Sequence, residues 1–394
     1  MFTTERCSSE RSWWGVLALA LSAFIFCTTE FLPVGLLKAI GDSLHIQSTN
    51  VGLMLTIYAW TVALASLPLT LLTRKVERRK LMTAILLVFI GSHIITGGAW
   101  NFTVLILGRI GIACAHAMFW SISISLTVRI APPEKKRRAL GLLAMGTSIA
   151  MVIGIPLGRV IGETIGWRIA FLIIALVATI LLPILRATLP KLPNLQTGSI
   201  KNLPALLKRP ALILLYIMTV LIVTAHFTSY TYIEPFIQVT SQASSDRITF
   251  ILILFGISGI PASICFNRLY SDQPDRFLLI SAITVSICLL VLFPSALNIV
   301  TLSIHVFIWG GAIVCFGLAM QGWILKFATE STDLAVSIYS GLYNVGIGTG
   351  ALLGNHIAND YGLPWIGTFG GVVGGLGVIL CWLAIRIYDL KHSL

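Results

Sequence analysis

The chain has 394 residues, of which 57% are hydrophobic and 11% are charged, and its formal net charge is +12. Because a bilayer core about 30 Å thick takes roughly 20 apolar residues for each helical crossing, this composition indicates a multi-pass membrane protein and excludes a soluble globular one. The positive charge does not indicate nucleic-acid binding, since the basic residues lie in short loops beside apolar stretches, where membrane topology accounts for them.

Twelve apolar stretches of membrane-spanning length follow one another along the chain. They comprise residues 13–37, 49–72, 81–100, 103–130, 139–161, 169–185, 211–238, 248–266, 277–294, 301–325, 334–357 and 364–387. We therefore predict an all-α integral membrane protein with twelve transmembrane helices. Prolines and basic residues in the segment 189–209 predict a cytoplasmic linker between two halves of six spans each, residues 1–188 and 210–394.

The distribution of basic residues predicts the orientation of these spans. If the amino terminus is cytoplasmic, most of the 27 lysines and arginines fall in cytoplasmic loops, with clusters at residues 74–80 and 135–138. Both termini are then cytoplasmic. The first stretch is too long for a signal-peptide core and lacks a small-residue cleavage pattern after it, so we expect it to remain as a helix. The seven cysteines show no disulfide framework or metal-ligand spacing, and we expect neither a metal nor a cofactor.

Two ionisable residues in the first and fourth spans form the leading candidate site. Glu30 precedes Pro33 and Gly35, which weaken the helix beyond it. Arg109 lies at mid-helix, where an arginine costs about 2.5 to 3.5 kcal/mol, and it shares one helical face with His116 and Trp120. A carboxyl whose distance from Arg109 changes could take up and release protons, so we interpret these groups as a proton-coupling site. The alternative is a static buried ion pair that ties helices together.

The seventh span repeats this pattern in the second half of the chain. His226, Tyr230 and Glu234 are four residues apart along one helical face, and Pro235 follows them. Glu234 is a candidate for proton coupling, or alternatively an outer gate or a cap for broken backbone. His116 and His226 are suited to passing protons at physiological pH, or alternatively serve as structural hydrogen-bonding groups.

Glycine and proline interrupt the fifth span, and several glycines interrupt the eleventh span at corresponding places. Glycine lets helices approach closely, and proline removes a backbone hydrogen bond, so paired interruptions in two halves indicate a site at a repeat interface. Packing alone is the alternative. The candidate hinges are Pro33, Gly154, Pro156 and Gly158.

Aromatic and neutral polar residues supply the remaining groups of a candidate substrate cavity. Aromatic faces stack on the C–H faces of sugars while amides and imidazoles bind hydroxyls, although the same set suits an amphipathic drug. For each residue, packing or a place in the membrane-interface belt is the alternative. The candidates are Tyr58, Trp120, His226, Tyr230, Gln321, Tyr343 and Asn344.

Several of these motifs resemble the major facilitator superfamily, and within it the twelve-span drug and sugar proton antiporters. The segment 154–158 is similar to the antiporter motif of the fifth helix, Arg109 with Ala113 to the arginine motif of the fourth, and residues 166–168 to the entry of the sixth. The runs 28–37, 55–60, 77–81, 115–121 and 232–236 resemble bacterial sugar efflux transporters. The resemblance implies two pseudo-symmetric six-helix bundles, alternating access and a place in the bacterial cytoplasmic membrane.

The loop after the second span departs from the pattern of that superfamily. The resemblance implies that Arg78 and Arg79 take part in gating, but Arg74 replaces the usual acid and Glu77 replaces the usual glycine. The charge relay that closes the cytoplasmic side must then be built differently, with Glu77 as a candidate for the acid.

We predict proton-coupled efflux of sugars or related small polar compounds, and the resemblance implies arabinose and thiogalactosides as substrates and export as the direction. The alternative is multidrug efflux by proton antiport. A channel is disfavoured because no filter segment repeats, and an enzyme because the buried ionisable groups show no catalytic spacing. The expected partners are a small-molecule substrate, protons and membrane lipid but no nucleic acid, and we expect a monomer.

Overall fold

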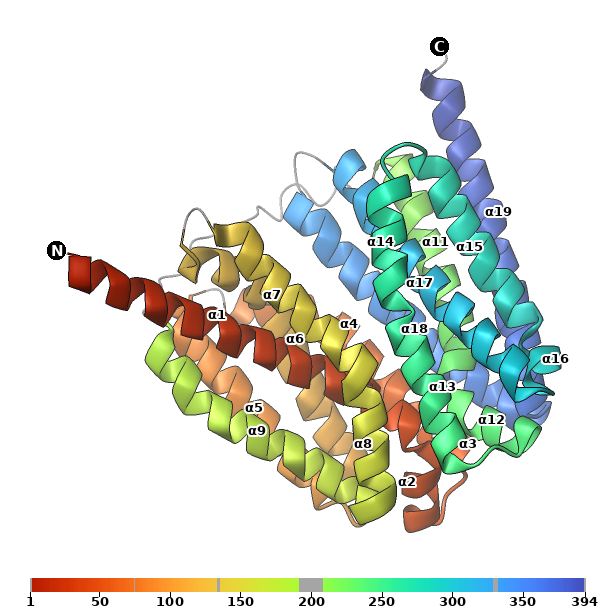
Figure 1. Ribbon diagram of the computed structural model, residues 1–394, viewed down its shortest axis with the longest axis horizontal. Coiled ribbons are helices and arrows are strands. Elements are labelled where there is room, and N and C mark those ends of the chain that lie inside the picture. Colours follow the sequence, from red (N-terminus) through yellow and green to blue (C-terminus); the bar gives the residue numbers. More distant parts are fainter. Residues whose placement is uncertain (1, 74, 133–134, 191–207, 329–331, 393–394) are drawn as a thin grey trace. The chain divides into compact units, whose positions relative to one another are not determined.

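The computed structural model describes residues 2–73, 75–132, 135–190, 208–328 and 332–392, and these contain helices and connecting turns but no strand (Figure 1). The predicted all-α class is therefore confirmed. Contacts within the chain define two units, one of Met1–His45 with Thr61–Gln196 and one of Ile46–Trp60 with Thr197–Leu394. The division into residues 1–188, 189–209 and 210–394 stays a prediction, and most of its linker lies outside the described residues.

The first unit is built from the spans of the first half of the chain. Its elements are α1 (Phe2–Phe31), the 3₁₀ turn η1 (Leu32–Gly35), α2 (Leu37–Leu44), the part of α4 (Leu53–Leu72) from Thr61 onward, α5 (Arg78–Gly97), α6 (Phe102–Ile130), α7 (Lys136–Ile149), the π-helical turn η3 (Ala150–Gly154), α8 (Ile155–Ile161), the π-helical turn η4 (Gly162–Gly166) and α9 (Trp167–Thr188).

The second unit is built mainly from the spans of the second half. Its elements are α3 (Ser48–Val51) and the start of α4, followed by α11 (Pro210–Tyr230), α12 (Ile233–Ser241), α13 (Ser245–Ile257), α14 (Gly259–Leu269), α15 (Pro274–Leu290), α16 (Leu292–Ala296), α17 (Ile299–Phe327), α18 (Thr332–Asp360), the 3₁₀ turn η6 (Leu363–Trp365) and α19 (Ile366–His392).

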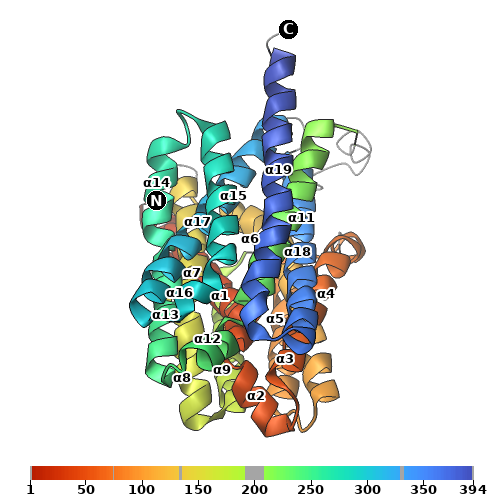
Figure 2. The ribbon, with the colours of Figure 1, turned by 90° about the vertical axis from the view of Figure 1, so that its right-hand side faces the viewer.

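The same pattern of helix packing occurs inside each unit. In the first unit α1 packs against α7 and α9, while α5 packs against α6 and α9 (Figure 1). In the second unit α11 packs against α18 and α19, while α15 packs against α17 and α19 (Figure 2). These helices occupy corresponding places in the order of the predicted spans. The two halves of the chain therefore repeat the same order of helices and the same packing between them.

Nine helical segments of the described residues are long and apolar enough to cross a membrane. The difference from the twelve predicted spans has a physical cause at each place. The segment Arg138–Thr188, with 51 residues, contains both the fifth and the sixth predicted span. The helix α15 has only 17 residues because a turn separates it from α16. Glycine and asparagine lower the hydropathy of α18, although it has 29 residues.

The first and fifth predicted spans are irregular where they face each other. The helix α1 gives way to η1 at Leu32, since Pro33 has no backbone N–H to continue the α-helical ladder. In the fifth span, π-helical turns flank the short helix α8, whose first turn contains Pro156. The turn η1 packs on α8. The four predicted hinge residues thus all lie in or beside irregular helix, and their role as hinges stays a prediction.

Glycines on the fifth span allow the first span to pack directly against it. A Cβ atom added to any of four of these glycines would collide with an atom of the first span. At Gly146 that atom is a backbone oxygen, whereas at the other three glycines it belongs to a side chain that can rotate. The facing pairs are Gly146 with Ala20, Gly154 with Thr28, Gly158 with Leu32 and Gly162 with Leu36. These glycines therefore set the distance between the two helices.

We expect Gly146→Ala to destabilise the protein by about 2 kcal/mol, because the Ala20 carbonyl cannot rotate away and the helices must separate. The matched control is Gly141→Ala on the same helix, where a Cβ has open space around it. That change should be neutral or slightly stabilising because alanine favours helix. Thermal unfolding of both purified variants checks the difference, and equal midpoints would show that the contact is not a tight one.

Candidate functional site

Arg109 is completely buried in α6 and binds the backbone at the end of α1. Its Nη1 donates to the Thr29 carbonyl oxygen at 2.7 Å and its Nη2 to the Glu30 carbonyl oxygen at 3.3 Å. An α-helix would pair the Thr29 carbonyl with the N–H four residues further on, but that residue is Pro33, which has none. The guanidinium thus stabilises a carbonyl that proline leaves without its helical partner.

The Glu30 side chain lies beside His116 in the same buried region. Its Oε2 atom is 3.7 Å from Nε2 of His116, and both residues are less than 10% exposed. The sequence predicted a contact between Glu30 and Arg109, and the structure brings these residues together through the Glu30 backbone. A carboxyl, an imidazole and a guanidinium are therefore grouped at the point where the first span becomes irregular.

His93 also belongs to this group, although the sequence analysis did not select it. Its Nδ1 atom is 2.8 Å from the Phe89 carbonyl oxygen and its Nε2 atom is 2.7 Å from Oγ1 of Thr29. Because a carbonyl only accepts, Nδ1 carries the proton and Nε2 accepts from the Thr29 hydroxyl when the ring is neutral. A histidine inside the third predicted span is a signal that could have identified it.

Aromatic rings pack against this ionisable group. The Phe26 ring is stacked on Phe119 with centroids 4.3 Å apart and lies 4.0 Å from Phe89. Trp120 is half-buried, and its ring centroid is 6.2 Å from that of His116. The sequence placed His116 and Trp120 on one face of the helix, and the structure brings them together.

A second cluster surrounds His226 in the other unit. The His226 ring is stacked on Tyr230 at 5.1 Å between centroids and on Phe255 at 5.9 Å, and it meets the Trp309 ring at 5.2 Å with the planes 71° apart. The described residues offer no hydrogen-bond partner to the buried atoms Nδ1 of His226 and Nε1 of Trp309. Burying such groups without a partner is costly, and the cost falls if water or another polar group reaches these two atoms.

Phe255 and Trp309 were missed by the sequence analysis, and no sequence signal distinguishes them, because aromatic residues make up 10% of the chain. The structure shows why they belong with His226, since α13 and α17 carry them to the same place. We refer to His226, Tyr230, Phe255 and Trp309 as the aromatic box.

The remaining candidates are more scattered. Glu234 is buried in the first turn of α12, just after the turn that separates this helix from α11. Tyr58 is buried in the part of α4 that belongs to the second unit. Gln321 is exposed on α17, and Tyr343 is half-buried on α18. Asn344 is buried and donates to the Ser340 carbonyl at 3.0 Å, while its Oδ1 atom has no partner among the described residues.

Glu77, the acid in the basic loop after the second span, caps a helix. The Glu77 carboxylate accepts from the backbone N–H groups of Arg79 at 2.8 Å and Lys80 at 3.2 Å, and so caps the start of α5. Arg78 and Arg79 lie half-buried in the first turn of that helix, and Arg74 lies outside the described residues. Among the described residues, no group of three or more histidine, cysteine and acidic side chains could hold a metal.

Comparison with known proteins gives three consistent results. The family model described as Major Facilitator Superfamily matches residues 19–332. A protein of Mannheimia succiniciproducens named probable sugar efflux transporter is 47% identical over 378 residues, which cover 96% of this chain and 94% of that protein. The crystal structure of a bacterial homologue of the human lysosomal transporter Spinster, inward-facing and unoccupied, has a TM-score of 0.71 at 14% identity and 96% coverage of both chains. This last likeness concerns the fold alone.

Proposed function

Because the chain belongs to the major facilitator superfamily, we propose that it exports sugars or related small polar compounds by alternating access, driven by inward movement of protons. Membership in this superfamily makes it a multi-pass membrane transport protein and not an enzyme. The near full-length similarity to a protein named probable sugar efflux transporter is the observation that carries the substrate class. The proposal includes a monomer in the bacterial cytoplasmic membrane with both termini cytoplasmic.

The Glu30 carboxyl and the His116 imidazole, which lie in the same buried region as Arg109, support the proposed coupling to protons. Glu30 and His116 are so close that a proton bound to either one changes the net charge of the pair, and the Arg109 guanidinium responds to that charge. Arg109 also holds the carbonyls at the end of α1. Protonation of Glu30 thus weakens the attraction that keeps Arg109 in place and loosens the first span at η1, while loss of the proton restores it.

The aromatic box supports a polar, ring-shaped substrate in the second unit. Its four rings offer faces for the C–H groups of a sugar, while Nδ1 of His226 and Nε1 of Trp309 are available for hydroxyls. Because His226, Tyr230 and Trp309 are at most 5% exposed in this structure, a substrate reaches the box only when α11, α13 and α17 move apart during the cycle. A lipophilic drug would gain nothing from the two nitrogen atoms, so they favour a sugar over the multidrug alternative.

The substrate class is tested with labelled pentoses, disaccharides and thiogalactosides, and with lipophilic cations, in efflux from energised cells. We expect efflux of at least one sugar class and none of the cations. Trp309→Phe keeps the ring but removes the N–H group, so we expect the KM for sugar to rise about 10-fold, the loss of one hydrogen bond. The control is Trp382→Phe, whose ring is exposed on α19. Cation efflux without sugar efflux would establish the drug pump instead.

A further inference from the structure

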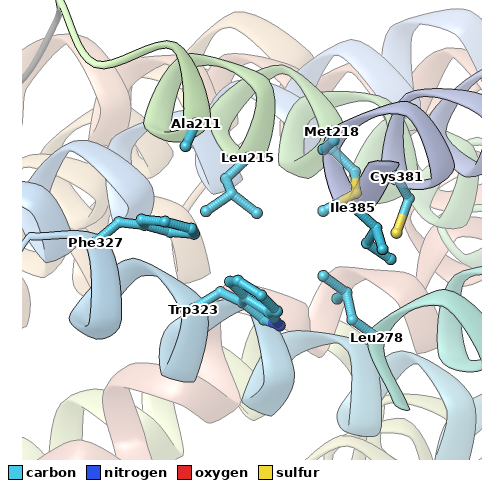
Figure 3. Close-up of a pocket in the computed structure, with 9 residues that line it drawn as sticks. Ala211, Leu215, Met218, Leu278, Trp323, Phe327, Cys381 and Ile385 are labelled. Atoms are coloured by element: carbon cyan, nitrogen blue, oxygen red, sulfur yellow. The ribbon is translucent and has the colours of Figure 1, made fainter. Parts of the chain in front are cut away.

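An apolar cavity lies at the end of the second unit where α11 and α15 begin and α17 and α19 end. The cavity together with the open solvent at its mouth contains about 350 Å³ of space not filled by atoms. Figure 3 shows side chains from the four helices converging on it, with Leu215 and Trp323 facing each other across the space. Its lining residues are Ala211, Leu215, Met218, Leu278, Trp323, Phe327, Cys381, Ala384 and Ile385.

The cavity has a buried floor and an open rim. Leu215, Met218, Leu278, Trp323 and Cys381 form the floor, and each of them is at most 3% exposed. Ala211, Phe327, Ala384 and Ile385 form the rim and are partly exposed. A cavity lined in this way holds water poorly because it offers few hydrogen bonds, and it favours a flexible hydrocarbon.

Basic residues stand next to the rim just before α11, on α17 and on α19. Nη1 of Arg209 donates to the carbonyl oxygen of Phe327 at 2.8 Å, and Nζ of Lys326 lies 4.7 Å from the centroid of the Trp323 ring. Arg386 directly follows Ile385 and lies 5.4 Å from the Trp382 ring centroid. The acids at this end of the four lining helices are Asp275, in the first turn of α15, and Asp389, near the end of α19, and the basic residues there outnumber them. Positive charge therefore predominates around the mouth of a purely apolar cavity.

We propose that this cavity binds one acyl chain of an anionic phospholipid, whose phosphate group is held by Arg209, Lys326 and Arg386. The charge at the rim matches an anionic head group, and the apolar floor matches the hydrocarbon attached to it. A neutral apolar solute would not need the three cations, and a soluble anion would not need the floor. The bound chain packs α11 against α15, α17 and α19, so lipid binding stabilises this end of the unit whatever substrate the protein carries.

Fluorescence quenching by brominated lipids tests this site in the full-length protein. Trp323 lies in the floor, so the part of the quenching that disappears in Trp323→Phe reports bromine inside the cavity. We expect this part to saturate with dibromo-phosphatidylglycerol at a mole fraction at least fivefold lower than with dibromo-phosphatidylcholine. Equal saturation by the two lipids, or no quenching of Trp323 by either, would overturn the proposal.

Two kinds of variant separate the head-group contacts from the cavity. Lys326→Gln with Arg386→Gln should remove the preference for phosphatidylglycerol while quenching of Trp323 remains. Leu215→Phe fills the floor and should abolish Trp323 quenching by both lipids. The matched control is Lys135→Gln with Arg138→Gln, a basic pair 5.9 and 5.5 Å from the Trp13 ring in the first unit. If the control lowers the preference as much as the test pair does, general surface charge and not this site attracts the lipid.

Discussion

Replacement of Arg109 by lysine is expected to lower the rate of sugar efflux at least 10-fold while the protein still inserts in the membrane. The guanidinium binds two successive carbonyls at the end of α1 through two different nitrogen atoms. The single ammonium nitrogen of lysine cannot span both carbonyls. A hydrogen bond to a charged group contributes about 1.5 to 3 kcal/mol, so the loss of one corresponds to roughly a 10- to 150-fold effect. Efflux per molecule of protein in the membrane measures it.

A double-mutant cycle with Pro33 tests the structural reason for this effect. Arg109→Met leaves the Thr29 carbonyl without its partner, whereas Pro33→Ala restores an N–H group that can bind that carbonyl within the helix. We therefore expect Pro33→Ala to recover part of the stability that Arg109→Met loses, by about 1 kcal/mol in thermal or denaturant unfolding. Strictly additive losses in the double variant would show that the two residues do not share this carbonyl.

The second large effect is expected at the Glu30 carboxyl. Glu30→Gln removes the titratable group but retains the size and hydrogen-bonding capacity of the side chain beside His116. We expect sugar efflux driven by a pH gradient to be abolished, while exchange of labelled for unlabelled sugar at equal pH continues, since exchange needs no net proton movement. Asp42→Asn, which removes an exposed acid in the same unit, is the matched control and should leave both activities unchanged. Gradient-driven efflux that survives Glu30→Gln would remove this carboxyl from the mechanism.

Most of the fold follows from the sequence because the bilayer makes hydropathy decisive. The all-helical class and the order of the spans were predicted, and the proline and glycine after Glu30 indicated the irregular turn at Leu32. Both α15, which ends at a turn, and α18, which is rich in glycine and asparagine, were predicted as spans, although as helices they fall short in length or hydropathy. The family match confirmed membership in the major facilitator superfamily, which composition alone does not specify.

The candidate site was predictable only in part. Arg109, Glu30 and His116 stand out because charge is rare inside a span, and His93 carries the same signal. The binding of Arg109 to carbonyls of α1 was not predicted, because the spacing of residues along one helix does not show how its side chains meet another helix. Phe255 and Trp309 are ordinary aromatic residues until the fold brings them to His226, and Glu77 is recognised as a cap only from its position before α5.

The most direct test of the account is a measurement of proton movement caused by sugar movement in sealed proteoliposomes. The protein is reconstituted with a pH-sensitive dye inside, and a sugar gradient is imposed with no initial difference in pH. We predict that sugar leaving the vesicles makes the interior more acidic, and that Glu30→Gln shows no change in the dye signal. Sugar movement that leaves the internal pH constant in the unaltered protein would contradict proton-coupled efflux.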